Sequence, residues 1–447
     1  MELKRLNTTQ IMALGFAAVI LTGAVLLSLP ISSSSGESVG FYDALFTSTS
    51  AVCVTGLVVL DVGNDLSIFG QIVLILLIQT GGLGFMTIAT LLFMLAGKRI
   101  TLRDRLVIQE AMNESGLSGM VRLIRWVIWM TLAFEAVGAA LLATSFVPDF
   151  GWARGLYYAV FHSISAFCNA GFDLLGNYTS LTPYQLDPVV NLTISFLIIS
   201  GGLGFGVWRD LFRNRGRFHN LRLHTRLVLV TTGGLLVGGT LLIAALEWTN
   251  PGTIAGMNFI QKIQAAFFQS VTMRTAGFNT VDLAAMHPET KFVSSILMFI
   301  GAAPASTGGG IKVTTFVLMG LFVSTVARGR ENCVLFKRTV SHATVMRAMV
   351  VAIISACVVG VDLLLLTIAE QDTAFVDLMF ETLSAFGTVG VSSAGTPNLG
   401  YFARAILIFT MFIGRVGPLT LTLAVASGQA KKSDVKIRYP EDRVLVG

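Results

Sequence analysis

Residues 271–278 read VTMRTAGF, and three similar stretches occur in the chain: AVCVTGLV from Ala51, AFCNAGFD from Ala166 and AFGTVGVS from Ala385. Each contains a glycine that follows a phenylalanine by ten residues. The glycines are Gly56, Gly171, Gly277 and Gly390, and the phenylalanines are Phe46, Phe161, Phe267 and Phe380. Because one spacing recurs four times in different surroundings, we infer a structural unit that is repeated four times.

The composition places this repeated unit in a membrane. The 447 residues are 54% hydrophobic and only 13% charged, with a mean hydropathy of +0.75. No soluble fold has enough interior to bury so much apolar surface. The first apolar run, 11–29, lacks a small-x-small cleavage site and is expected to stay as a membrane helix. The four cysteines have neither metal-site nor disulfide spacing.

The basic residues are clustered in a way that predicts topology. Most of the 31 Lys and Arg lie in five segments: Lys4–Arg5, Lys98–Arg125, Arg209–Arg226, Arg328–Arg347 and Lys431–Arg443. The positive-inside rule then places both termini and three connecting loops in the cytoplasm. Nucleic acid binding is not expected, because no aromatic stacking platform accompanies the basic residues.

Between the basic clusters lie pairs of apolar segments, each near or above the length needed to cross a bilayer. The outward spans are about 8–29, 121–146, 225–248 and 344–369, and the inward spans are about 66–95, 189–211, 292–326 and 402–426. The predicted fold is an all-α integral membrane protein with eight crossings and four re-entrant pore loops, in pseudo-fourfold arrangement around a central pore. Its four units are 1–98, 99–218, 219–335 and 336–447.

The segment between the two spans of a unit is too short to cross, because ten helical residues rise only about 15 Å. We expect short helices at 41–53, 156–168, 263–273 and 376–386 that enter the membrane and return. The glycine strand after each helix leaves carbonyls unpaired, which is tolerated at membrane depth beside a water-filled path. A ring of such carbonyls can replace the hydration shell of a monovalent cation. Interfacial turns in a helical bundle are the alternative.

With these repeats the sequence resembles the Trk/Ktr/HKT superfamily of cation transporters, whose single chains carry four M1-P-M2 units. The resemblance covers nearly the whole chain, and SVTMRTAGFNTVDL at 270–283 is its most specific stretch. The glycine strands read CVTG, CNAG, RTAG and GTVG, where a tetrameric potassium channel has TVGYG. The absence of an additional N-terminal helix pair and the ending IRYPEDRVLVG look like a KtrB-type bacterial subunit.

The resemblance implies potassium uptake across the bacterial plasma membrane, a homodimer, and a separate cytoplasmic nucleotide-binding ring of the KtrA type. It permits sodium as an activator, and we identify neither a sodium site nor an organic cofactor site in the chain. The K⁺-binding filter residues are expected to be Val54, Thr55, Gly56, Asn169, Ala170, Gly171, Thr275, Ala276, Gly277, Thr388, Val389 and Gly390. A symporter that couples K⁺ to Na⁺ or H⁺ is the alternative. The parallel orientation of the four units favours a pore.

The inward spans contain departures from simple helix: TGGLGF at 80–85, SGGLGF at 200–205, and GAAPASTGGGIK at 301–312. The last stretch cannot form a uniform helix, so we expect a mobile intramembrane loop on the cytoplasmic side of the filter. A close-packed kink is the alternative. The residues assigned to gating are Gly301, Ala302, Ala303, Pro304, Ala305, Ser306, Thr307, Gly308, Gly309, Gly310, Lys312 and Arg415.

Charged residues in the spans need partners or water. We expect Arg274 to brace the filter from behind, and family resemblance places Arg415 below the filter near the gating loop. The alternative for Arg415 is a buried pair with a carboxylate such as Glu381. Asp173 and Asp282 either concentrate cations at the outer mouth or are solvated loop acids.

No catalytic set accompanies His162 in the second short helix. Ser163 and Ser165 stand beside it, but neither a nucleophile–base–orienter arrangement nor a GxSxG turn is present. We therefore do not expect an enzyme.

Overall fold

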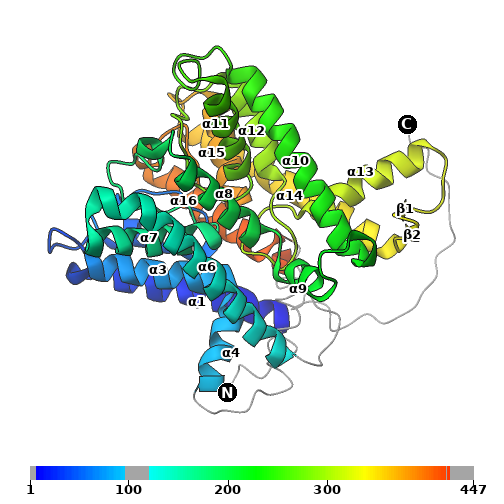
Figure 1. The fold of residues 1–447 in the computed structure, drawn as a ribbon, viewed down its shortest axis with the longest axis horizontal. Coiled ribbons are helices and arrows are strands. Elements are labelled where there is room, and N and C mark those ends of the chain that lie inside the picture. Colours follow the sequence, from blue (N-terminus) through cyan, green and yellow to red (C-terminus); the bar gives the residue numbers. More distant parts are fainter. Residues whose placement is uncertain (1–6, 96–119, 419, 423–447) are drawn as a thin grey trace.

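The structure is a computed structural model that describes residues 7–95, 120–418 and 420–422 (Figure 1). Helices make up nearly all of its regular structure. The one sheet in the described part is a hairpin of β1 (Val334–Leu335) and β2 (Arg338–Thr339). The basic segments 98–105 and 431–443 lie outside the described residues.

Four long helices open the four units. They are α1 (Thr8–Leu27), α6 (Met120–Phe150), α10 (Leu223–Glu247) and α14 (His342–Ala369). Each is long and apolar enough to cross a membrane, and each lies where an outward span is predicted. Large apolar side chains such as Leu14, Val137 and Leu364 remain exposed on them. That exposure fits helices whose surroundings are lipid rather than water.

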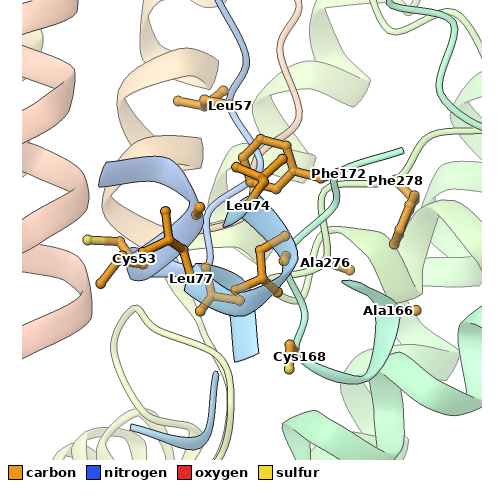
Figure 2. Packing of buried hydrophobic residues seen from close by; sticks show 14 of the residues in the cluster. Cys53, Leu57, Leu74, Leu77, Ala166, Cys168, Phe172, Ala276 and Phe278 are labelled. Carbon is orange, nitrogen blue, oxygen red and sulfur yellow. The ribbon is translucent and has the colours of Figure 1, made fainter. Parts of the chain in front are cut away.

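Four shorter helices follow the long ones. They are α2 (Phe41–Cys53), α7 (Trp152–Phe167), α11 (Phe259–Thr272) and α15 (Phe375–Gly387). The first has the bounds that the sequence predicts, and α7 and α11 begin about one turn earlier than predicted. Their C-terminal halves are buried, so these helices end in the interior of the protein. The core surrounds the strands that come next, as the packing of Cys53, Phe172 and Phe278 shows (Figure 2).

The inward segments are broken rather than continuous. The helix pairs are α3 (Ile68–Leu83) with α4 (Phe85–Leu95), α8 (Pro188–Gly202) with α9 (Phe205–Arg213), and α12 (Pro288–Phe299) with α13 (Val313–Ala327), and the fourth unit has α16 (Tyr401–Val416). The first pair bends by 103° and the second by 94°. Each bend falls within a stretch where the sequence indicates a departure from simple helix, TGGLGF at 80–85 and SGGLGF at 200–205. The reason for each bend is a glycine with positive φ at the break, Gly84 and Gly204 respectively.

Candidate ion pathway

The strand after each short helix has the same backbone form in all four units. The residue two before each repeated glycine has a positive φ: 56° at Val54, 61° at Asn169, 65° at Thr275 and 49° at Thr388. The glycines also have positive φ, between 70° at Gly171 and 97° at Gly56. A left-handed conformation at a side-chain-bearing residue is rare and costs energy, so four equivalent occurrences mark one repeated, tightly constrained structure.

The four strands close into a ring, called here the glycine ring. A Cβ atom added to any of the four glycines would lie closer than 3.0 Å to a carbonyl oxygen of the next unit. These glycine–oxygen pairs are Gly56 with Ala170, Gly171 with Ala276, Gly277 with Val389, and Gly390 with Thr55. The pairs run from the first unit to the fourth and back to the first. The strands thus surround one axis, and each glycine is required by the close approach of its neighbour.

Hydroxyl groups of the short helices hold the strands in place. The backbone N–H groups of Gly56 and Gly390 donate to Ser50 Oγ and Ser384 Oγ, each at 3.0 Å. In the second unit Ser165 Oγ donates to the Phe172 carbonyl at 2.8 Å. In the third unit Thr272 Oγ1 donates to the Phe278 carbonyl. The strands therefore do not depend on van der Waals packing alone for their position.

The third strand is one residue shorter than the other three. The backbone bonds Thr55 to Ser50, Ala170 to Ser165 and Val389 to Ser384 each span five residues, whereas Ala276 to Thr272 spans four. The buried phenylalanine of the third short helix is accordingly Phe268, while Phe267 is half-buried. The ten-residue spacing to Phe267 is thus a coincidence of sequence in this unit.

Two cavities lie on opposite sides of the glycine ring, one of about 370 Å³ and one of about 330 Å³. The outer cavity, about 370 Å³, is lined by all four ring glycines together with Asp173 and Asp282. Burial raises the pKa of the Asp173 carboxyl to about 6, and the nearby Asp61 adds to that increase. Both acids predicted near the outer mouth therefore line the approach to the ring.

The glycine-rich loop, residues 301–312, lies directly beneath the ring. Thr307 Oγ1 donates to Asn169 Oδ1 at 3.1 Å, and the Gly309 N–H donates to Thr388 Oγ1 at 3.0 Å. Gly308 packs against the side chain of Thr275. The loop thus contacts three of the four residues that precede the ring glycines by two positions.

The loop is also anchored along its length. The Gly301 N–H donates to the Ile311 carbonyl at 2.8 Å, and the Ala303 N–H donates to the Gly202 carbonyl at 3.0 Å. The Phe205 N–H donates to the Ala305 carbonyl at 3.0 Å. Ala302, Ala303 and Thr307 are buried. The loop is therefore well packed in this conformation, because the break in α8–α9 supplies backbone partners for it, and its mobility stays a prediction.

Arg415 joins the loop to the first unit. Its guanidinium donates to the carbonyls of Thr307 and Gly81, and to that of Gly82 at 3.4 Å. No carboxylate in the described part of the chain forms an ion pair with Arg415. Glu381 instead accepts a hydrogen bond from Thr396 Oγ1, so the Glu381 alternative is wrong.

Lys312 lies on the same side of the glycine ring as Arg415. Its Nζ donates to the Gly308 carbonyl at 2.7 Å. Lys312 and Arg415 both line the inner cavity of about 330 Å³, together with Pro304, Ala305 and Ser306 of the loop. Two cationic side chains therefore face the space below the glycine ring.

Arg274 is buried behind the third ring strand and donates to a backbone carbonyl. Its Nη2 lies 3.4 Å from the Gly301 carbonyl, at the start of the glycine-rich loop. The role of Arg274 in bracing the filter stays a prediction.

Sequence reasoning missed how the inward helices touch the short helices. Gly81, Gly201 and Gly414 each lie against a backbone carbonyl at the end of a short helix, those of Val52, Phe167 and Phe386 respectively. The motifs TGG, SGG and IGR could have indicated this contact, since each places a glycine shortly before the point where the inward helix breaks. His162, by contrast, is a packed residue: its Nδ1 lies 2.7 Å from the Tyr158 carbonyl among aromatic rings.

The family model described as TrkH, a cation transport protein, matches residues 5–434. The chain belongs to the TrkH family of cation transport proteins. It is 43% identical over 443 residues to the Ktr system potassium uptake protein B of Bacillus subtilis, covering 99% of this chain and 97% of that protein. It is 39% identical over 447 residues to the potassium/sodium uptake protein NtpJ of Enterococcus hirae, covering 99% and 98%.

The fold also matches a solved member of the TrkH family. The crystal structure of the potassium transporter TrkH from Vibrio parahaemolyticus has a TM-score of 0.74 and 18% identity, and the match covers 94% of this chain and 85% of that one. The predicted all-α membrane fold is confirmed. The family consists of transport proteins, so the prediction that the chain is not an enzyme is confirmed as well.

Proposed function

We propose that this chain takes up potassium across the bacterial plasma membrane, passively, through the glycine ring. The observation that carries the proposal is the closed succession of carbonyls from Thr55, Ala170, Ala276 and Val389 around one axis. Carbonyl oxygens in such a ring substitute for the water that a monovalent cation loses. The short helices end at the ring, so their C-termini direct partial negative charge toward it. Relatives named for potassium uptake support K⁺ as the ion.

The glycine-rich loop and Arg415 act as the gate in this proposal. The loop occupies the space beneath the ring, and the guanidinium that holds it adds positive charge to the path of a cation. A charge in that position raises the electrostatic barrier to a passing cation. The conformation described is therefore the closed one, and opening requires the loop to leave Asn169 and Thr388.

A soluble regulatory partner is the second element of the proposal. The exposed basic segments 209–226 and 328–338 come together where the rings of Phe218 and Phe336 lie 6.4 Å apart. One continuous cytoplasmic surface of that kind suits an acidic face of a nucleotide-binding ring, and relatives are named as parts of a Ktr system. We further propose a homodimer with both termini in the cytoplasm. Purified protein alone should then lack nucleotide-responsive flux.

A sodium-linked mode is the alternative, favoured by one observation. The Enterococcus hirae relative is named a potassium/sodium uptake protein. Sodium would then either activate potassium flux or move with it. The expected filter residues of the four ring strands are uncharged, and a ring of backbone carbonyls suits conduction better than stoichiometric coupling.

A proteoliposome flux assay tests the proposal. Uptake of K⁺, Rb⁺ and Na⁺ is measured under clamped membrane potentials, with and without opposing Na⁺ or H⁺ gradients. Passive conduction predicts that K⁺ flux reverses at the potassium equilibrium potential and ignores the other gradients. A reversal potential that moves with the Na⁺ or H⁺ gradient would establish the symporter instead.

A further inference from the structure

Gln79 connects two units of the protein at membrane depth. It lies on α3, two residues before Gly81. Its Nε2 donates to Glu135 Oε1 at 3.0 Å, and its Oε1 accepts from Cys168 Sγ at 3.3 Å. Both partners belong to the second unit, Glu135 on the long helix α6 and Cys168 at the end of α7. Among uncharged side chains, a carboxamide can donate to a carboxyl group and accept from a thiol at the same time.

The end of α3 is also packed tightly on the second unit. A Cβ atom added to Gly82 would lie 2.7 Å from Cys168 Sγ. Gly81 and Gly82 are the residues whose carbonyls accept from Arg415. The position of Gln79 therefore sets where those two carbonyls stand relative to the guanidinium.

These contacts close into a circuit that includes the ring and the loop. Cys168 is followed directly by Asn169, whose Oδ1 accepts from Thr307 and whose Nδ2 donates to Thr275 Oγ1 at 3.2 Å. The Thr307 carbonyl in turn accepts from Arg415. The circuit thus returns to α3 through Arg415. A displacement of α3 would disturb both the hydrogen bonds by which Arg415 holds the loop and the second strand of the ring.

We propose that Gln79 and Glu135 are positioning residues that hold the Gly81 and Gly82 carbonyls against Arg415, and so couple the closed gate to the second strand of the glycine ring. The inference rests on the gate assigned in the proposed function. Glu135 is buried in a membrane helix, where an ionisable side chain is costly and is usually retained for function. Its side chain accepts the hydrogen bond from Gln79.

The first test removes the carboxamide. Gln79→Leu should raise K⁺ leak in the absence of a regulatory partner about tenfold, as loss of about 1.4 kcal/mol from the closed state requires. It should also lower the preference for K⁺ over Na⁺, because Cys168 and Asn169 lose their support. Arg415→Ala should raise leak without changing ion preference, since the Gln79 bonds remain.

The matched control is Gln71→Leu on the same helix. Gln71 is buried, whereas Gln79 is half-buried, and Gln71 makes three side-chain bonds against two for Gln79: its Nε2 donates to the carbonyls of Val62 and Leu66, and its Oε1 accepts from Tyr157. It lies near the start of α3, away from the carbonyls that bind Arg415. Gln71→Leu should lower thermal stability at least as much as Gln79→Leu and leave leak within about twofold of wild type.

A swap separates positioning from simple packing. Gln79→Glu places two carboxyl groups together and should raise leak. Glu135→Gln keeps an acceptor oxygen for the Gln79 amide and should stay close to wild type. In the double variant the amide at position 135 donates to the carboxyl at position 79, so leak should return to within about twofold of wild type. A double variant that leaks as much as Gln79→Glu alone would overturn the proposal.

Loop position can be followed without measuring ion flux, which separates this proposal from the proposed function. Ser306 lines the inner cavity, so Ser306→Cys reports access from the cytoplasm to a membrane-impermeant maleimide. Labelling should be about tenfold faster when Gln79→Leu is added and unchanged with Gln71→Leu. Equal labelling rates in all three backgrounds would refute the positioning role, whichever ion the protein carries. A labelling change in a protein without K⁺ flux would instead refute the proposed function alone.

Discussion

The four units are nearly equivalent at the glycine ring and differ where their inward helices break. In the first, second and fourth units the break is a single glycine, Gly84, Gly204 or Gly417, with φ of 81°, 89° and 94°. In the third unit the break is the loop 301–312, which fills the space below the ring. The comparison teaches that the break of the third unit differs from the other three in length, and that its loop contacts strands of the second, third and fourth units.

The largest expected effect comes from shortening the loop 301–312 of the third unit. Deleting several residues between Ala303 and Gly310 should raise unactivated K⁺ flux about 100-fold, because the segment beneath the ring is removed. Ion preference should not change, since all four ring strands remain. Flux is measured in proteoliposomes with and without the regulatory partner. Loss of transport in a folded, inserted protein would mean that the loop is structural.

The equivalence of the ring can be tested by one substitution repeated four times. Gly277→Ser should reduce the preference for K⁺ over Na⁺ about tenfold, equivalent to about 1.4 kcal/mol, because a side chain displaces the adjacent carbonyl. The same change at Gly56, Gly171 and Gly390 should have an effect of similar size. Reversal potentials in mixed K⁺ and Na⁺ provide the measurement. Unchanged preference in all four variants would remove the filter assignment.

The single-glycine breaks at Gly84 and Gly204 also differ from each other in their contact with the loop 301–312. An alanine at either Gly84 or Gly204 adopts an unfavourable φ, which costs about 1–3 kcal/mol of stability. At Gly204 the added Cβ also lies 2.7 Å from the Pro304 carbonyl, whereas nothing lies within 4 Å at Gly84. Gly204→Ala should therefore lower the melting temperature and raise leak a few-fold, by about 1 kcal/mol. Gly84→Ala should affect the melting temperature alone, and leak from both variants would contradict the distinction.

The smallest effect is expected outside the ring, where the units lose their equivalence. The residue two after each ring glycine is Val58, Asp173, Asn279 or Ser392, and only one of these is acidic. Because burial raises the pKa of Asp173 to about 6, its carboxylate is charged above that pH and neutral below it. K⁺ uptake at low external concentration should fall about twofold as external pH drops from 7 to 5. Asp173→Asn should flatten that dependence, and an unchanged pH profile would exclude Asp173 as its source.

Much of the architecture follows from local properties of the chain. Apolar length and clustered basic residues predicted the long helices, and recurrence around Gly56 and Gly171 predicted the short helices and ring strands. Each of these signals lies within a few tens of residues, because membrane helices and tight turns satisfy their backbone bonds locally. The sequence also indicated departures from simple helix around Gly84 and Gly204, but it did not predict the size of the bends, because a glycine within a helical stretch has no fixed meaning until its φ is known.

What the sequence determined, then, is the set of elements: membrane helices, four short helices, the glycines that only a close-packed ring requires, and one inward segment that cannot be helical. The tertiary structure decided which distant groups meet. Arg415 bonds to Gly81 and Thr307, which lie 334 and 108 residues from it, and Gln79 bonds to Glu135 in the next unit. The register of the third strand, with Phe268 buried in place of Phe267, is likewise evident only from the tertiary structure. A guanidinium or carboxamide can bond to any nearby carbonyl or carboxyl group, so its partner depends on how the helices pack around the axis.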